Sequence, residues 1–282
     1  ANGLSEDQIA TALADVGAQL KNNFDRDRAG LALRTLSSER ERKQALDVFA
    51  RIIQSPEFPQ EILLREKARI ISSIKESSTK PDYIGERDLM KMLYRSHPYG
   101  FNEMGEIETL NKLQREDLLT FYRSYYVAGN AVIAIIGDVT RLEAAAIAER
   151  LTENLSSGGL KAEVSAVPIP VAETKRIPHP ATQSHIQSAY PGLRRSDPDY
   201  FPLLVGNHIL GGGGFVSRLM EEVRQKRGLA YSVYSFFAPY KEQGPFQIGL
   251  QTKKEQSEEA LALTQKVLKE FVASGPTEEE LL

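Results

Sequence analysis

The stretch that decides the fold is LGGGGFVSRLMEEVRQKRGLAYSVY, residues 210–234. Its four consecutive glycines separate the end of one expected helix from the start of another. After them, Phe215, Leu219 and Val223 recur at helical spacing, with charged residues between them. Gly228 then ends this helix, and residues 229–237 are rich in β-branched and aromatic side chains, as strands are. The stretch therefore predicts a helix, a glycine loop, a second helix and a strand.

The glycine run admits three interpretations. A flexible linker before an ordinary helix fits the composition, because glycine restrains the backbone least. A nucleotide-binding loop fits less well, since no Gly-Lys-Ser or Gly-Lys-Thr follows the run and no strand leads directly into it. The third interpretation is a loop whose bare backbone lets another chain come close.

The composition is that of an ordinary globular protein, with 282 residues, 41% hydrophobic and 26% charged. This length allows two domains, each with its own core. The net charge of -3 comes from 35 basic and 38 acidic residues that are well mixed, so nothing indicates binding to nucleic acid or to an acidic membrane surface. The absence of cysteine excludes disulfides, thiolate nucleophiles and cysteine-type zinc sites.

Hydrophobic periodicity divides the rest of the chain into mixed helices and strands. Ser5 and Gln8 stand at capping-box spacing, and Pro59 and Pro81 fit the first turns of helices. The short apolar run at 131–138 ends in turn residues, which is the pattern of a buried strand. The expected helices cover residues 5–20, 41–53, 59–77, 81–93, 115–126, 140–155, 199–210 and 256–272. The expected strands cover residues 21–25, 29–36, 131–138, 185–190, 229–237 and 246–252.

A change of character at residues 156–172 marks the domain boundary. This segment is polar, is punctuated by proline and glycine, and has no periodicity. We expect an N-terminal domain at 1–155, a linker at 156–172 and a C-terminal domain at 173–282. A hairpin connection at 240–244 would pair the last two strands antiparallel. Mixed helices and antiparallel hairpins indicate the α+β class.

Catalytic chemistry is thinly supplied in this sequence. No two of the four histidines sit at i, i+4 spacing on a common helix, and neither His-Glu-x-x-His nor His-x-x-Glu-His occurs. His97 and His179 each precede a proline and fit turns. His185 in a strand and His208 near a helix end fit packing or hydrogen-bonding roles. No Gly-x-Ser-x-Gly elbow is present, so the residues alone predict no metal site and no nucleophile.

The residues do resemble those of the M16 (pitrilysin/insulinase-type) zinc peptidases. Residues 210–234 are similar to the second domain of that family. Further similarities follow in family order at His97-Pro98-Tyr99-Gly100 with Gly105, at 130–138, at Pro191-Gly192 and at 197–200. The resemblance implies two related M16-type domains with the LuxS/metallopeptidase-like fold, each a mostly antiparallel sheet packed with helices. It also implies that both domains are incomplete in this chain.

The resemblance further implies a zinc site that this chain does not complete. In the family, two histidines of an inverted His-x-x-Glu-His motif and a glutamate on a later helix bind catalytic zinc, and the motif would fall just before Ala1. The ligand glutamate corresponds to Ser73, and a family glutamate one heptad earlier corresponds to Glu66. A serine hydroxyl is a feeble zinc ligand, and Glu76 points roughly a quarter-turn away from Glu66. Residues 29–32 also replace polar and aromatic residues of active members. We therefore expect no catalytic residue and no metal ligand in this chain.

The family includes two-chain enzymes in which a metal-free subunit completes the site of a zinc-bearing one. The resemblance implies that Arg224 and Tyr231, seven residues apart, bind the substrate backbone together with Gly211, Gly212, Gly213 and Gly214. A guanidinium and a phenol can both donate hydrogen bonds to a peptide carbonyl and to the oxyanion formed from it. Two plainer roles stay open, because Arg224 could be a helix-end cation and Tyr231 could face a core.

Our first hypothesis is a non-catalytic M16 subunit that forms a clam-shell-like heterodimer, or self-associates, and grips an extended peptide. Zinc would then be expected in the catalytic partner and not in this chain. The alternatives are a catalytically dead structural or binding module, and an active zinc peptidase whose histidine motif lies upstream of Ala1. No feature fixes the compartment, and a bacterial periplasm or envelope is the location that we favour.

Overall fold

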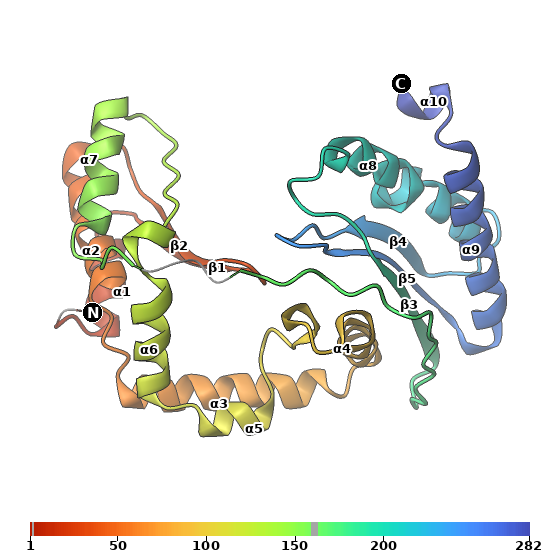
Figure 1. Cartoon of the computed structure of the whole chain (residues 1–282), viewed down its shortest axis with the longest axis horizontal. Helices are drawn as coiled ribbons and strands as arrows, with labels where there is room; N and C mark the ends of the chain where they lie inside the picture. Colours follow the sequence, from red (N-terminus) through yellow and green to blue (C-terminus); the bar gives the residue numbers. More distant parts are fainter. Residues whose placement is uncertain (2, 159–162) are drawn as a thin grey trace. The chain divides into compact units, whose positions relative to one another are not determined.

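The computed structural model describes residues 1, 3–158 and 163–282, and these residues form two compact units (Figure 1). The first unit comprises Ala1–Ile71 and Glu106–Glu163, and the second comprises Ser72–Gly105 and Val164–Leu282. Residues 72–105 thus group with the C-terminal part of the chain, and the domain bounds expected from the sequence stay a prediction. Residues 159–162 of the expected linker lie outside the described residues.

The first unit is mainly helical, with one antiparallel hairpin. Its helices and strands are α1 (Glu6–Ala14), β1 (Gln19–Phe24), β2 (Ala29–Arg34), α2 (Glu39–Gln54), most of α3 (Gln60–Ser77), α5 (Ile107–Lys112), α6 (Arg115–Tyr125), the short 3₁₀ turn η2 (Ala128–Asn130) and α7 (Arg141–Thr152). The capping box predicted at Ser5 and Gln8 is present. The helix ends earlier than expected, because Gly17 takes a left-handed φ of 62° and turns the chain into β1.

The core of this unit forms around α2, whose apolar residues have helical spacing. Ala45 and Val48 pack with Leu13 and Val16 from the end of α1 and the turn after it. Phe49 on α2 packs in a second cluster with apolar residues of α7 and of the hairpin. The strands expected at 21–25 and 29–36 are confirmed as β1 and β2, and the structure pairs them antiparallel, with Gln19 opposite Arg34 and Phe24 opposite Ala29.

The prediction of a buried strand at 131–138 is wrong. These residues belong to no strand, and Val132 and Ile136 are 90% and 99% exposed. A strand needs a neighbour to satisfy its backbone hydrogen bonds. No described strand pairs with this segment, so its apolar composition does not become burial.

The second unit holds a three-stranded antiparallel sheet in the order β3-β5-β4. Its helices and strands are α4 (Pro81–Tyr94), η1 (Pro98–Gly100), β3 (Gln183–Pro191), α8 (Tyr200–Asn207), η3 (His208–Gly212), η4 (Gly214–Val216), η5 (Met220–Gln225), β4 (Ser232–Phe237), β5 (Pro245–Lys253), η6 (Lys254–Gln256), α9 (Ser257–Ser274) and α10 (Glu278–Leu281). The predicted antiparallel pairing of the last two strands is confirmed, with Ser232 opposite Gln251 and Phe237 opposite Phe246.

Alternation along β5 assigns α9 and α4 to opposite faces of this sheet (Figure 1). Ile248 and Leu250 are buried in a cluster with Ala260 and Val267 of α9. Gln247, which points the other way, donates from Nε2 to both carboxylate oxygens of Glu86 on α4, at 3.0 and 2.9 Å. The mixture of helices and antiparallel sheet confirms the α+β class expected from the sequence. Within the described residues, no helix has both the length and the apolar character needed to span a membrane.

Candidate functional site

Two π-helical turns lie in this region: η3 (His208–Gly212) contains the first two glycines of the run, and η5 (Met220–Gln225) follows the run. The first, η3, follows α8 directly, and the N–H of Gly213 donates to the carbonyl of His208 at 2.8 Å. The second, η5, ends where the N–H of Lys226 donates to the carbonyl of Glu221 at 2.9 Å. Both bonds span five residues, whereas an α-helical bond spans four. The sequence periodicity predicted helix here but did not predict this rarer winding.

Three of the four glycines are required by close packing within the chain. A Cβ atom on Gly211 would lie 2.4 Å from Oγ and 2.6 Å from the backbone N of Ser235 on β4. On Gly212 it would lie 2.6 Å from Nδ2 of Asn207, and on Gly213 it would lie 2.7 Å from the carbonyl oxygen of His208. Backbone atoms at these distances leave no room for a side chain at Gly211 or Gly213, and at Gly212 the Asn207 amide, which is bonded to Ser235, would have to move. The chain that approaches Gly211 is therefore β4 of the same molecule, and a contact of this glycine with substrate stays a prediction.

A buried polar pair fixes the same turn to the sheet. Ser235 Oγ donates to Asn207 Oδ1 at 2.7 Å, and Asn207 Nδ2 donates to the Ser235 carbonyl at 3.2 Å. Asn207 and Ser235 are 7% and 2% exposed. Both bonds are shielded from water, so they hold the end of α8 against β4 with defined geometry.

The fourth glycine differs from the others. Gly214 has a φ of 61° and no atom within 4 Å of the place where a Cβ would stand. This left-handed residue turns the chain outward, and the two residues after it, Phe215 and Val216, are 66% and 81% exposed. The Ser217 hydroxyl closes the turn by donating to the Gly214 carbonyl at 2.7 Å.

Arg224 lies beside the exposed turn. Its Cζ atom is 4.9 Å from the centroid of the Phe215 ring and 5.8 Å from that of the Tyr231 ring. Its Nη1 contacts the Met220 sulfur at 3.9 Å. The structure thus brings together the predicted pair, Arg224 and Tyr231, and the end of the glycine run. Phe215 joins them, although the sequence reasoning assigned it only to the helix face.

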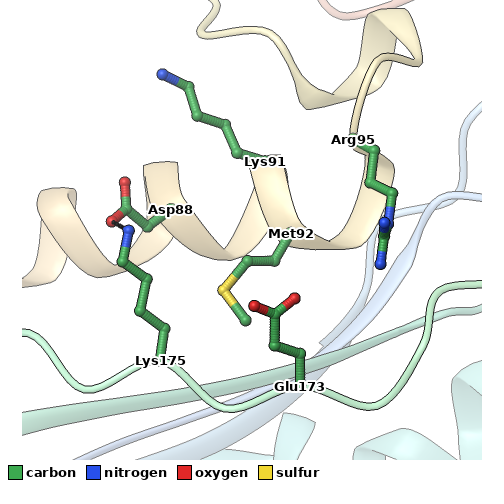
Figure 2. Close-up of a pocket in the computed structure, with 6 residues that line it drawn as sticks. All are labelled: Asp88, Lys91, Met92, Arg95, Glu173 and Lys175. Atoms are coloured by element: carbon green, nitrogen blue, oxygen red, sulfur yellow. Dashed lines mark hydrogen bonds and ion pairs between the residues drawn. The ribbon is translucent and has the colours of Figure 1, made fainter.

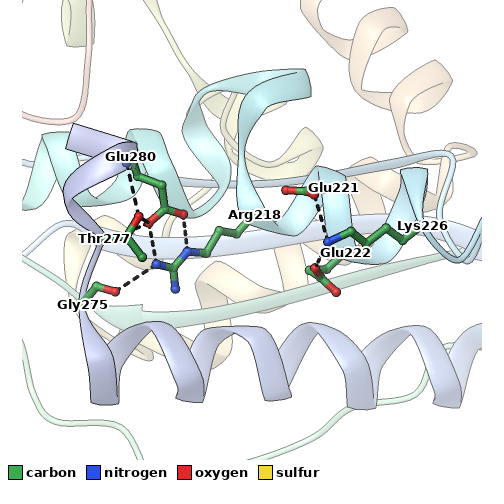
Figure 3. Close-up of polar contacts among 7 residues, drawn as sticks. All are labelled: Arg218, Glu221, Glu222, Lys226, Gly275, Thr277 and Glu280. Atoms are coloured by element: carbon green, nitrogen blue, oxygen red, sulfur yellow. Dashed lines mark hydrogen bonds and ion pairs between the residues drawn. The ribbon is translucent and has the colours of Figure 1, made fainter. Parts of the chain in front are cut away.

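No described carboxylate forms an ion pair with Arg224. Glu221 and Glu222 are on the same turn, but Lys226 Nζ contacts both, at 2.9 and 2.7 Å (Figure 3). Arg227 also contacts Glu222, at 2.6 Å. Hydrogen bonds from Lys226 and Arg227 hold the pKa of Glu222 below its usual range. The neighbouring acids are therefore already engaged, and the half-buried Arg224 retains an uncompensated charge.

Tyr231 is open to solvent, and the residue is 70% exposed. Its neighbours two residues away, Leu229 and Val233, are 5% and 1% exposed. Residues two apart share a face only in a regular strand, and β4 begins after Tyr231, at Ser232. Tyr231 does not face the core, which removes the plainer of the two roles considered for it.

A second arginine, Arg218, connects the segment after the glycine run to α10. Arg218 contacts Glu280 on α10 through two bonds, Nε to Oε1 at 2.5 Å and Nη2 to Oε2 at 2.6 Å (Figure 3). Arg218 Nη2 also donates to the Gly275 carbonyl at 3.0 Å. The hydrogen bonds from Arg218 lower the pKa of Glu280 to about 2. Arg218 is thus bonded to Glu280 and Gly275 of its own chain, whereas Arg224 forms no ion pair among the described residues.

The residues compared with zinc ligands do not fit a metal ion. Ser73 contacts the sulfur of Met104 at 3.9 Å. Glu66 pairs with Arg69 at 2.7 Å and with Arg65 at 3.3 Å, and Glu76 pairs with Lys80 at 2.9 Å. In the part of the chain that the structure describes, no group of three histidine, cysteine, aspartate or glutamate residues could hold a metal.

The histidines at the two predicted turns serve local structure. His97 is buried, its Nδ1 accepts from the Tyr99 N–H at 3.2 Å, and its Nε2 lies 2.9 Å from the Ser165 carbonyl. His179 Nδ1 likewise accepts from the Ala181 N–H at 3.1 Å. These contacts occupy the ring nitrogens that a metal or a substrate would need.

A separate hollow lies between α4 and residues 173–175, and Figure 2 shows the charged side chains around it. Lys175 Nζ contacts Asp88 Oδ2 at 2.7 Å on one side. Charges of both signs surround the hollow, with three basic and two acidic side chains. None of the site residues predicted from the sequence lines it. Its lining residues are Asp88, Lys91, Met92, Arg95, Glu173 and Lys175.

Two family models match almost the whole chain. Residues 1–105 match the Insulinase (Peptidase family M16) model, and residues 112–282 match the Peptidase M16 inactive domain model. A solved peptidase M16 inactive domain from Pseudomonas fluorescens is 39% identical, with a TM-score of 0.97, and the match covers 99% of this chain and 68% of that chain. The fold is thus that of M16 peptidases. The chain belongs to the M16 family, and its C-terminal part is of the inactive type.

Some relatives are named as proteases and one as a non-peptidase homolog. A Bacillus subtilis protein named Uncharacterized zinc protease YmxG is 28% identical over 239 residues, which are 84% of this chain and 57% of the relative. A Helicobacter pylori protein named Non-peptidase homolog YmxG is 27% identical over 246 residues, which are 84% of this chain and 55% of the relative. The chain spans little more than half the length of these two relatives.

Proposed function

We propose that this chain is the non-catalytic subunit of a hetero-oligomeric M16 metallopeptidase, in which Arg224, Tyr231 and the glycine run bind the backbone of an extended peptide. One observation carries the proposal. Arg224 is half-buried and has no acidic partner among the described residues, and it lies beside the exposed Tyr231, at the edge of a turn in which Gly211 packs against β4. Among the described residues, Arg224 contacts the Met220 sulfur and two aromatic rings but no carboxylate, so most of its donors are available to a ligand.

The chemistry of the two side chains suits a peptide backbone. The guanidinium carries several N–H donors in one plane, and the phenol adds an O–H donor. Neither group needs a particular substrate side chain, so the pair would bind carbonyl oxygens of many sequences. An extended peptide offers such carbonyls at regular spacing, as it does when it pairs with a strand. We expect weak side-chain selectivity.

The metal, under this proposal, belongs to the partner. Zinc in M16 peptidases would supply the activated water, and the residues of this chain do not fit it. Ser73 offers a neutral hydroxyl where a carboxylate is needed, and the carboxylates of Glu66 and Glu76 are engaged by arginine and lysine. The chain's own contribution is to hold the peptide and to orient the carbonyl that is attacked.

The proposal is tested by β-casein hydrolysis with this chain, a zinc-bearing M16 subunit from the same source, and their mixture. We expect activity in the mixture only. Arg224→Ala and Tyr231→Phe should each lower kcat/KM about tenfold or more, because a hydrogen bond to the reacting carbonyl is lost. Arg227→Ala is the matched control, since this arginine lies on the same turn but pairs with Glu222.

The outcomes separate the alternatives. Unchanged kcat/KM in both variants would refute the backbone grip and leave a structural or binding module. That alternative draws support from the Helicobacter pylori relative, whose name describes a non-peptidase homolog. Zinc-dependent hydrolysis by this chain alone, in a form extended upstream of Ala1, would instead establish an active peptidase.

A further inference from the structure

The Phe215 side chain lies outside the core, next to Arg224. It is a large aromatic residue that is 66% exposed, and it is absent from the apolar clusters of the unit. Burial of apolar surface therefore does not explain its place. Among the described residues, the one ring-face contact of Phe215 is with the Arg224 guanidinium, whose Cζ lies 4.9 Å from the ring centroid. Within the described residues, this ring serves the arginine and not the core.

The backbone of Phe215 is held on both sides. Before it, the carbonyl of Gly214 accepts from both the N–H and the hydroxyl of Ser217, at 3.1 and 2.7 Å. At Phe215 itself, the carbonyl accepts from Gln225 Nε2 at 2.9 Å. Gln225 directly follows Arg224 in the chain, so this bond ties the exposed turn to the turn that carries the arginine. The ring is thereby presented to the guanidinium by a fixed backbone.

The Arg224 side chain needs a contact that restrains its rotamers. An arginine side chain has many rotamers, and ordering it on binding opposes affinity. Ion pairs restrain the neighbouring cations Lys226 and Arg227, whereas Arg224 forms none among the described residues. A guanidinium that lies over a ring face is attracted by the ring and keeps its in-plane donors free. The ring therefore restrains the arginine without consuming all of its hydrogen-bond capacity.

We infer that Phe215 is a positioning residue, which holds Arg224 over its ring so that the guanidinium is ordered before the peptide binds. This inference rests on the proposed function of Arg224 as a peptide-binding group. In this arrangement the last glycine of the run has a defined role. Gly214 turns the chain outward, and the residue that it delivers to the arginine is Phe215.

Two measurements on the purified chain test the inference. The first is the Kd for fluorescein-labelled β-casein, an unfolded polypeptide, measured by fluorescence anisotropy. Phe215→Leu keeps an apolar side chain but removes the ring, and binding should weaken about two- to fivefold. Phe215→Tyr keeps the ring face and should bind as the wild type does. Val216→Ala, at the next residue, which is 81% exposed, is the control and should change nothing.

The second measurement reports the arginine directly. In a chain labelled with ¹⁵N-arginine, the Nε–H resonance of Arg224 is assigned by its loss in Arg224→Lys. The ring current of Phe215 shifts this resonance. Phe215→Leu should move it towards the position of a solvated arginine, and Phe215→Tyr should leave it in place. A role of Phe215 in folding alone would not produce this pattern.

The results also separate the two proposals. If Arg224→Ala weakens casein binding and Phe215→Leu does not, the positioning role is refuted and the proposed function stands. If Arg224→Ala leaves binding unchanged, the proposed function fails, and the Nε–H resonance still decides whether the ring orders the arginine. An unmoved resonance in Phe215→Leu would overturn the inference in either case.

Discussion

At the scale of single residues, Arg218 and Arg224 differ in the partners that surround their guanidinium groups. Both follow the glycine run, and each has an aromatic ring within 5.0 Å of its guanidinium carbon. Arg218 also has a carboxylate with two bonds, and Arg224 has none among the described residues. An arginine with both partners is saturated, whereas one with a ring alone keeps its charge for a ligand. The sequence pattern showed two arginines, and only the surrounding contacts tell them apart.

The close packing around Gly211 predicts that one added methyl group there lowers the free energy of unfolding substantially. Gly211→Ala would place a Cβ against the backbone N of Ser235, which cannot rotate away. We expect the free energy of unfolding to fall by about 2–3 kcal/mol, as in an overpacked core. Urea denaturation followed by circular dichroism measures this change.

The matched control for that substitution is Gly30→Ala in β2. No atom lies within 4 Å of the place where the new Cβ would stand, and the φ of Gly30 is not left-handed. We expect a change of less than about 0.5 kcal/mol, or slight stabilisation. Equal effects of the two substitutions would contradict the packing explanation of Gly211.

At the scale of elements, periodicity predicted the strands β1, β2, β3, β4 and β5 and most helices within a few residues. Two failures have physical causes. The run at 131–138 has a strand composition, but pairing depends on a neighbour that composition does not reveal. The π-helical turns η3 and η5 keep roughly helical spacing, so their extra residue is invisible in the pattern. For the site, the resemblance supplied Arg224 and Tyr231, and no signal in the sequence marked the stacking of Phe215.

The attachment of α10 is an element-scale feature that depends on pH. Glu280 has an ordinary pKa of 4.5 in the unfolded chain and a pKa of about 2 in the folded one, because Arg218 hydrogen-bonds its charged form. A lowered folded pKa stabilises the fold above the unfolded pKa. This stabilisation is complete above pH of about 4.5 and is lost as the pH falls towards about 2.

Glu280→Gln removes that dependence. At pH 7 we expect the variant to unfold with a free energy about 1 kcal/mol lower than the wild type, a value reduced for partial exposure of the pair. The difference should shrink as the pH is lowered from 5 to 3 in a urea series. Glu279→Gln, next to it and without an ion pair in the described residues, is the control. A difference that stays constant across this pH range would refute the role of the pair.

At the scale of the whole molecule, we propose that the chain binds the backbone of a peptide and contributes no metal ligand. The family is established by models that match residues 1–105 and 112–282, and the grip rests on the geometry around Arg224. Family membership alone does not decide between an enzyme and a dead homologue, as the names of the relatives show. The hydrolysis assays decide that question, and the proposed role further requires that this chain binds a peptide when zinc is absent.

That property is measured by the Kd of the EDTA-treated chain for fluorescein-labelled β-casein, in the wild type and in Arg224→Ala. The account predicts that the wild type binds casein without zinc. It predicts that Arg224→Ala weakens this binding about tenfold, which corresponds to about 1.4 kcal/mol. Casein binding that requires added zinc, or that is the same in both proteins, would contradict the central claim.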